Sequence, residues 1–321
     1  MKRSILLAAA IAVTFGFSVQ AKRYKIAVIP KGTTHSYWKT VHAGAAKAAI
    51  DFNVDIIWQG PLVESDRAEQ IKIIQNFISR RVDAICLAPL DDKAMVRPVK
   101  MVVKAKIPVV IFDSSLGWNG YTSFVATDNF QGGYLCGKLL AKSLNNKGRV
   151  IMMRYMVGSA STVKRENGFL KAMKEAGPGI KLISTNQYAG ATAVTAQKKS
   201  QSVITRFRGK FDGIYCPNES STFGMLRALE IARLAGKVKF VGFDTSKSLI
   251  KGVREGKIEG VAAQCPFKMG YEAVKAAVEK LNGKKVPKII DTGVVMVTKA
   301  DLDKPEIKEL INPPLKKYLN E

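Results

Sequence analysis

The sequence has few of the residues on which metal and catalytic chemistry usually depend. It contains two histidines, His35 and His42, and four widely separated cysteines that form no CxxC pair. A zinc site needs three or four closely arranged Cys, His or carboxylate ligands, so we expect no metal site. Both histidines fall in or near the start of one predicted helix, where we expect a surface or cleft role rather than general-base catalysis.

Nucleotide-binding and hydrolase signatures are also absent. No GxGxxG segment follows a predicted strand, and no GxxxxGK[ST] loop, HExxH helix or GxSxG elbow occurs. These absences argue against a dinucleotide cofactor, a nucleoside triphosphatase, a zinc protease and an α/β-hydrolase. We therefore expect no cofactor, no catalytic residues and no enzyme activity.

Acidic residues are scarce relative to basic ones. The 321 residues include 51 Lys and Arg against 26 Asp and Glu, which gives a net charge of +25. The lysines occur singly along predicted helices and loops, as solvated faces do, and no aromatic residues interleave with them in the manner of single-strand nucleic-acid binders. We expect no nucleic-acid partner. The length suits two ordinary domains.

Residues 1–21 have the three parts of a secretory signal. Lys2 and Arg3 precede an apolar run that ends at Val19, and Ala21 closes the segment. This arrangement predicts export with cleavage after Ala21. No second long apolar stretch follows, so no membrane span is expected in the mature chain.

The cysteines have a plain interpretation even in an exported protein. Cys86, Cys216 and Cys265 each lie in a short apolar run that predicts a buried strand. A buried cysteine of this kind behaves as a small hydrophobic residue. We favour free thiols over disulfides.

From Arg23 onward, short runs rich in Val and Ile alternate with longer stretches of helical periodicity. Such alternation is typical of a parallel sheet with helices on both faces. Residues 24–113 predict four strands and three helices, and residues 149–244 repeat the pattern. We predict an α/β fold with two similar doubly wound lobes.

The late strands predict that the chain crosses between the lobes several times. Crossings near Thr127, Gln264 and Gly293 would form a multi-strand hinge that lets the lobes close around a ligand. The N-terminal lobe is then expected to comprise 22–127 and 265–292, and the C-terminal lobe 128–264 and 293–321.

Polar residues follow the predicted strands where ligands bind in open α/β sheets. They stand at Lys31, Asp113-Ser114, Asn218-Glu219 and Asp244. Their carboxylate, amide and ammonium groups can donate and accept hydrogen bonds to a small polar ligand.

Nine short motifs occur in order along the chain. They are Tyr24–Pro30, Tyr37-Trp38, Ala84–Pro89, Ile111–Asp113, Thr127–Asn129 with Gly132-Gly133, Arg165 before Gly168-Phe169, Pro217-Asn218, Val241–Asp244 and Ala263-Gln264. Together they resemble the periplasmic sugar-binding proteins of type I fold, among them the ribose-binding and autoinducer-2-binding proteins. The resemblance spans essentially all of the mature chain.

The resemblance implies a periplasmic receptor that binds a small sugar or polyol between its lobes. Such a receptor delivers its ligand to the membrane permease of an ATP-binding-cassette importer, acts as a monomer, and in some cases also contacts a chemoreceptor. The ligand-binding residues implied are Lys31, Tyr37, Trp38, Asp113, Arg165, Asn218, Asp244 and Gln264.

Each candidate also has a structural interpretation. Asp113 and Asp244 could cap the following segment, and Trp38 could belong to the core. Arg165 could lie on the surface of a helix, Gln264 could bond the hinge backbone, and Asn218 could form a turn. Lys31 and Glu219 either face each other across the cleft or are solvated rim charges.

The departures from the two patterns leave the ligand open. Ala88 and Ser114 replace an Asn and an Arg of the ribose-binding pattern, and Lys164-Arg165 replaces an Asp-Gln pair of the autoinducer-2 pattern. An autoinducer-2-type receptor is the first alternative. An exported carbohydrate-active enzyme using Asp113, Asp244 or Glu219 is the second. A sugar-responsive repressor is disfavoured because no helix-turn-helix precedes the first strand.

Overall fold

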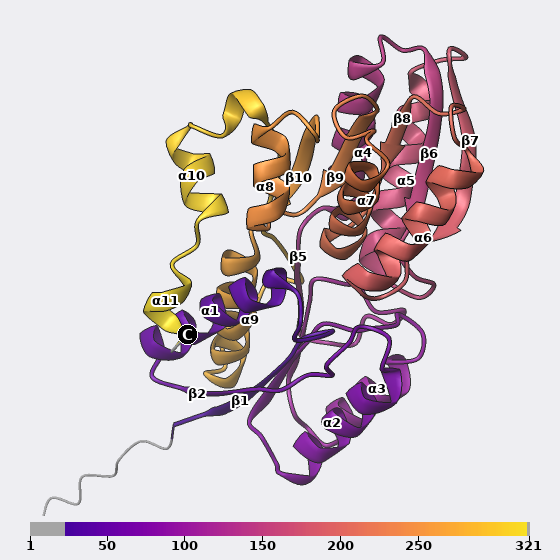
Figure 1. Cartoon of the computed structure of the whole chain (residues 1–321). Helices are drawn as coiled ribbons and strands as arrows, with labels where there is room; N and C mark the ends of the chain where they lie inside the picture. The colour runs from indigo at the N-terminus through magenta and orange to yellow at the C-terminus, as the bar shows by residue number, and fades with distance from the viewer. Residues whose placement is uncertain (1–22, 320–321) are drawn as a thin grey trace, which may run out of the picture.

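The computed structural model describes residues 23–319, which form two α/β lobes stacked along one axis (Figure 1). The first sheet has the strand order β11-β5-β4-β3-β1-β2, and the second has β12-β10-β9-β8-β6-β7. Every pairing is parallel except that of β12 with β10. The two predicted doubly wound lobes are confirmed.

The first lobe contains ten elements. They are β1 (Lys25–Ile29), α1 (Ser36–Asp51), β2 (Asp55–Trp58), α2 (Arg67–Ser79), β3 (Ala84–Leu87), α3 (Val96–Lys104), β4 (Val109–Phe112), β5 (Ser123–Ala126), α9 (Pro266–Leu281) and β11 (Ile289–Asp291). Strands β3 and β4 are buried at every position, because helices cover both faces of a parallel sheet.

The second lobe repeats this plan. It contains α4 (Asn129–Ser143), β6 (Gly148–Arg154), α5 (Ala160–Glu175), β7 (Ile180–Tyr188), α6 (Ala193–Arg206), β8 (Gly213–Tyr215), α7 (Glu219–Ile231), β9 (Lys239–Phe243), α8 (Lys247–Arg254), β10 (Gly260–Gln264), β12 (Val294–Thr298), the 3-10 turn η1 (Lys299–Asp301) and α10 (Pro305–Ile311). Each lobe has a hydrophobic core on both faces of its sheet.

One helix pair in each lobe packs through glycines. A Cβ atom on Gly44 would lie 1.9 Å from the Phe267 carbonyl oxygen, where α1 crosses α9. In the second lobe, a Cβ on Gly133 would lie 1.8 Å from the carbonyl oxygen of Arg165, where α4 crosses α5. Any side chain at these positions would force the helix axes apart.

Three segments join the lobes, at β5–α4, β10–α9 and β11–β12, where the hinge near Thr127, Gln264 and Gly293 was expected. A fourth crossing was not expected. After α10, whose Ile307 belongs to the core of the second lobe, the chain returns to the first lobe as α11 (Leu315–Tyr318) and packs on α1 (Figure 1). The Tyr318 ring lies 5.6 Å from that of Phe267.

Residues 293–321 therefore do not all stay with the second lobe as expected, because the aromatic contact holds the end of the tail against the first. The remaining domain boundaries stay a prediction. The expected signal segment, 1–21, lies outside the described residues. Between residues 23 and 319, no helix is both long and apolar enough to cross a membrane.

All four cysteines are free thiols, as favoured from the sequence. Cys86, Cys136 and Cys216 are buried, and burial raises the pKa of the Cys136 thiol to about 12. Cys265 departs from the expected strand. It is half-buried and occupies the position that begins α9, one residue after β10 ends.

Candidate functional site

The carboxyl ends of strands from both sheets face one another across a cleft between the lobes. Two adjoining cavities occupy it, one of about 30 Å³ and one of about 880 Å³. All eight residues predicted from the sequence line the smaller cavity. Tyr37, Asp244 and Gln264 line both.

Asp113 follows β4 in the first lobe and has a left-handed backbone, with φ of 61°. Aspartate is among the few non-glycine residues that adopt this conformation readily. Its carboxylate lies 2.7 Å from the Lys31 ammonium and accepts a hydrogen bond of 3.0 Å from the Tyr37 hydroxyl. Both Lys31 and Asp113 are buried, so their charges form an ion pair inside the cleft.

Asp244 occupies the corresponding place after β9 in the second lobe, and its φ is 73°. Its carboxylate accepts hydrogen bonds from the Gln264 amide at 2.7 Å and from the Glu219 backbone N–H at 2.8 Å. Burial raises the pKa of Asp244, and the Arg165 guanidinium opposes that shift. The buried Gln264 Oε1 has no hydrogen-bond partner within the described residues.

Arg165 lies inside the cleft, so a place on the surface of its helix is wrong. It is 2% exposed, its Nε donates to Asn129 Oδ1 at 2.8 Å, and its Nη1 donates to the Pro217 carbonyl at 3.0 Å. The guanidinium carbon lies 3.9 Å from the centre of the Phe243 ring. These contacts fix the guanidinium in one position.

Trp38 and Asn218 each have a structural role as well as a place in the cavity wall. Trp38 is buried in the first-lobe core and meets the Tyr37 ring edge to face at 4.9 Å. Asn218 begins α7, and its Oδ1 accepts a hydrogen bond from the Ser221 hydroxyl. Trp38 therefore belongs to the core and Asn218 lies at the start of a helix, and ligand binding by either residue stays a prediction.

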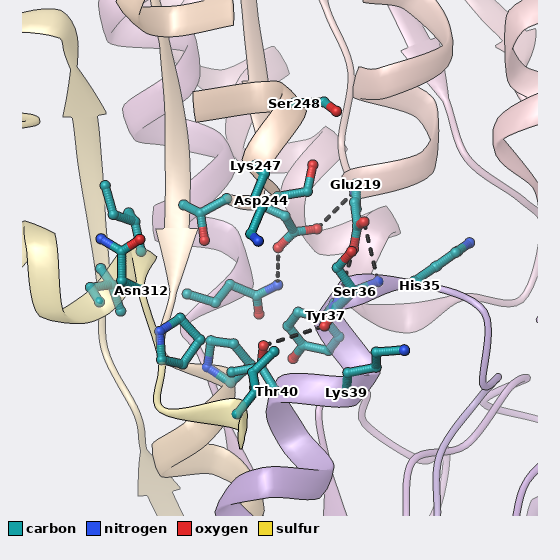
Figure 2. Close-up of a pocket in the computed structure, with 18 of the residues that line it drawn as sticks. His35, Ser36, Tyr37, Lys39, Thr40, Glu219, Asp244, Lys247, Ser248 and Asn312 are labelled. Atoms are coloured by element: carbon teal, nitrogen blue, oxygen red, sulfur yellow. Dashed lines mark hydrogen bonds between the residues drawn. The ribbon is translucent and has the colours of Figure 1, made fainter. Parts of the chain in front are cut away.

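Lys31 and Glu219 have separate partners, and Lys31 is buried rather than a solvated charge. Glu219 instead accepts hydrogen bonds from the backbone N–H groups of Ser36 and Tyr37, in the first turn of α1 (Figure 2). A carboxylate at a helix N-terminus satisfies free N–H groups and interacts favourably with the helix dipole. Glu219 comes from the second lobe, so this contact also joins the lobes.

Two further contacts cross the cleft. Lys31 Nζ donates to the Ser161 hydroxyl at 3.0 Å, and the Ser161 backbone N–H donates to the Ser114 hydroxyl at 3.0 Å. Ser114, which stands where the ribose-binding pattern has Arg, thus bonds the other lobe directly. In this conformation the two lobes are closed on each other.

Sequence reasoning missed Glu64, which is buried in the loop between β2 and α2. Its carboxylate accepts hydrogen bonds from His35 Nδ1 at 2.8 Å, Trp38 Nε1 at 2.7 Å and the Tyr155 hydroxyl at 2.9 Å. We call these four residues the Glu64 cluster. The rule that ligands bind beyond the strand ends also applies to the segment after β2 and could have found Glu64.

The larger cavity opens from the same cleft toward the C-terminal tail. One wall consists of the start of α1, with Ser36 and Thr40, and the facing wall consists of Asp244 to Ser248 (Figure 2). The tail contributes residues 310–317. Across residues 23–319, no group of three His, Cys, Asp or Glu side chains is placed to hold a metal ion.

Two α/β lobes with polar strand ends facing a shared cleft, joined by several hinge segments, define a binding protein that closes on its ligand. A family model described as a periplasmic binding protein domain matches residues 26–285. The chain belongs to this periplasmic binding protein family. The family consists of transport substrate-binding proteins rather than enzymes.

Individual relatives agree with this assignment. The ribose import binding protein of Escherichia coli K12 is 26% identical over 287 residues, which cover 89% of this chain and 95% of that protein. A carbohydrate transporter solute binding protein from Agrobacterium radiobacter, in complex with D-arabinose, has a TM-score of 0.87 and 33% identity, covering 91% of this chain and all of that one. An ABC transporter solute binding protein from Agrobacterium vitis with bound D-fucose has a TM-score of 0.85 and 36% identity, covering 90% and 100%.

Proposed function

We propose that this protein is a periplasmic receptor that binds a small neutral sugar or polyol in the cleft and delivers it to an ATP-binding-cassette importer. The observation that carries the proposal is the pair of carboxylates Asp113 and Asp244, which stand at corresponding strand ends of opposite lobes and line one cavity. A ligand held by both would stabilise the closed form over the open form.

The donors and acceptors in the cleft suit vicinal hydroxyl groups. Asp113 and Asp244 accept hydrogen bonds, Arg165 and Lys31 donate them, and Gln264 Oε1 is a further acceptor. Tyr37 offers an aromatic surface for the apolar face of a sugar ring.

The charges of the cleft favour a neutral ligand. Lys31 is paired with Asp113, His35 with Glu64, and the Arg165 guanidinium acts on Asp244. Glu219 is satisfied by the N-terminus of α1. Among the described residues that line the smaller cavity, each cationic side chain therefore interacts with a carboxylate of the cleft, which favours a ligand without a charge of its own.

The ligands of similar structures give the sugars to try first. D-arabinose and D-fucose are bound in the two proteins described above, α-D-tagatopyranose in another protein from Agrobacterium vitis, and D-allose in one from Actinobacillus succinogenes. We infer that a monosaccharide of this size is the ligand here. The protein is expected to act as a monomer in the periplasm, with the permease and, as a further partner, a chemoreceptor.

Thermal unfolding of residues 22–321, freed of co-purified ligand, tests the proposal. The panel comprises these four sugars, D-ribose, autoinducer-2 and myo-inositol. A ligand at 100 times its dissociation constant stabilises the protein by about 2.7 kcal/mol, which raises the melting temperature by several degrees. A selective rise with one compound is expected, and a flat response to the whole panel would contradict the proposal.

Two variants locate the site. Arg165→Ala is expected to abolish the rise, whereas Arg227→Ala, which removes an arginine from the surface of α7, should leave it unchanged. Turnover of a nitrophenyl glycoside by the purified protein would favour the enzyme alternative instead.

A further inference from the structure

The Glu64 cluster joins the two lobes through one buried carboxylate. His35, Trp38 and Glu64 belong to the first lobe, whereas Tyr155 follows β6 of the second. The Tyr155 hydroxyl donates to Glu64 Oε2, while Trp38 and His35 contact Oε1. All four side chains line the smaller cavity. Separation of the lobes would break the Tyr155 bond and admit water to the carboxylate.

The buried carboxylate is charged because its partners favour the charged form. Burial on its own would raise the pKa of Glu64, but the His35 imidazolium, Lys31 and the Trp38 N–H together lower it to about 2. Burial would likewise lower the pKa of His35, but Glu64, and to a lesser extent Glu219 and Asp244 from the second lobe, raise it to about 9.

Other groups around His35 do not replace Glu64 in this role. Lys31 lies in the same cavity but is paired with Asp113, and its positive charge would oppose protonation of the imidazole. Glu219 is bonded to the start of α1, and Asp244 is bonded to Gln264. Lys39, on α1, lines the larger cavity along with His35. Glu64 is the carboxylate in hydrogen-bond contact with the ring.

We propose that Glu64 is a positioning residue that holds His35 as a charged donor in the cleft, and that Tyr155 couples this ion pair to closure of the lobes. The proposal rests on the proposed receptor function, because it assigns to one cluster a part in ligand-driven closure. It predicts that closure is linked to the uptake of a proton.

The direction of the pH dependence follows from linkage. Closure brings Glu219 and Asp244 toward His35, and although closure also buries the ring, the carboxylates together raise the pKa of His35 to about 9 in spite of burial, so we expect His35 to have the higher pKa in the closed form. Its contribution to sugar binding is fully present below the pKa of the open form and is lost as the pH rises through about 9. Each unit by which closure raises that pKa weakens binding about tenfold across the range.

Histidine NMR tests the ion pair directly, because the chain contains only two histidines. In the wild-type protein without sugar, His35 is expected to titrate well above 6.5 and His42 serves as an internal reference. Glu64→Gln should return the pKa of His35 toward 6.5 without moving that of His42. A wild-type His35 that titrates near 6.5, or an unchanged titration in Glu64→Gln, would overturn the proposal.

Calorimetric binding of D-arabinose and D-fucose at pH 6 and pH 9.5 tests the coupling. The wild-type protein should bind more weakly at pH 9.5, and Tyr155→Phe should weaken binding at pH 6. The control is Tyr134→Phe, which removes a Tyr–Glu hydrogen bond of 2.6 Å on the surface of the second lobe and should leave binding unchanged. Equal binding by wild type and Tyr155→Phe would overturn the coupling. If neither sugar binds, the choice of ligand in the proposed function fails, whereas the NMR titration still decides on the ion pair.

Discussion

Each lobe has an aspartate directly after the corresponding strand of its sheet, but the two aspartates have different partners. Asp113 follows β4 and Asp244 follows β9, each third from one end of its sheet. Asp113 is paired with a buried ammonium, whereas Asp244 is held by an amide and a backbone N–H. Asp113 therefore forms a direct ion pair, whereas Asp244 is stabilised by hydrogen bonds together with the nearby charge of the Arg165 guanidinium.

This difference indicates that Asp113 is held in place before the ligand binds, whereas Asp244 gains more from contact with the ligand. An ion pair between buried groups fixes the first wall before any ligand arrives, because either charge alone would be costly to bury. In the second lobe, burial raises the pKa of Asp244 and of Glu219, which means that the charged forms of these carboxylates are destabilised there. A ligand that donates hydrogen bonds to Asp244 would relieve this cost.

The largest difference between the lobes is expected in the free energy of unfolding when each aspartate is replaced by asparagine in turn. Asn tolerates the positive φ at both positions, so Asp113→Asn and Asp244→Asn preserve the backbone. Asp113→Asn leaves Lys31 buried without its anionic partner and should lower the free energy of unfolding by about 3 kcal/mol. Asp244→Asn should cost about 1 kcal/mol, since an amide oxygen can still accept a hydrogen bond.

Urea unfolding of both variants checks this order. The double variant Lys31→Met with Asp113→Asn serves as the control, because removing both charges should recover much of the loss. Equal destabilisation by the two single variants would show that the walls are held alike.

The glycine crossings of the two lobes should differ in their effect on binding rather than on stability. Gly44→Ala and Gly133→Ala each drive a Cβ into a facing carbonyl and should cost about 2 kcal/mol. Gly133 abuts the backbone of Arg165, so Gly133→Ala should also weaken sugar binding more than Gly44→Ala does. Unfolding and calorimetric titration of the same samples measure both effects. Equal losses of sugar affinity in the two variants would show that the position of α5 is unimportant for binding.

Glu64 in the first lobe and Asp244 in the second should contribute to the pH dependence of unfolding with opposite signs. The lowered pKa of Glu64 makes its contribution present above 4.5 and lost as the pH falls through about 2. The raised pKa of Asp244 works the other way, so its unfavourable contribution fades as the pH falls toward 3.8. Melting temperatures between pH 6 and pH 3 should fall less steeply in Glu64→Gln, by an amount equivalent to about 1 kcal/mol, and more steeply in Asp244→Asn. A common slope in both variants would contradict the electrostatic difference.

Among these changes, removal of the C-terminal tail should have the smallest effect on the free energy of unfolding and a clearer effect on the rate of sugar dissociation. Ending the chain after Ile311 removes α11 and its contact with α1 while keeping α10 in the second-lobe core. We expect a loss below about 1 kcal/mol, together with faster sugar dissociation, because a fourth connection between the lobes is gone. Stopped-flow fluorescence measures the rate. Tyr318→Ala, which keeps the backbone and removes the ring that contacts Phe267, should reproduce part of the change.

Most of the fold could be predicted because strands that are buried on both faces appear in the sequence as continuous apolar runs. Two of the elements that escaped prediction, β11 and α4, have weak signals. Strand β11 has only three residues, and Gly132, Gly133 and Gly137 lower the helix propensity of α4. The close approach of α5 requires Gly133 and Gly137, and the Phe243 ring of β9 requires Gly132. Local periodicity does not show such tertiary contacts.

The site could be predicted where a side chain follows a strand, or where the family resemblance marks a residue such as Arg165, and not where partners meet across the cleft. Asp113, Asp244 and Lys31 follow strands, and all three line the cavity. Glu64 lies six residues beyond the end of β2, and its partner Tyr155 comes from the other lobe. No spacing along the chain brings these two together, since only closure of the lobes does.

Calorimetric titration of D-arabinose and D-fucose into the wild-type protein, Asp113→Asn and Asp244→Asn tests most directly whether both lobes hold one ligand. The account predicts one-to-one binding of at least one sugar by the wild-type protein and a large loss of affinity in each variant, although the variants alter opposite walls. Binding that survives unchanged in either variant would mean that one lobe alone holds the ligand, and would contradict the account.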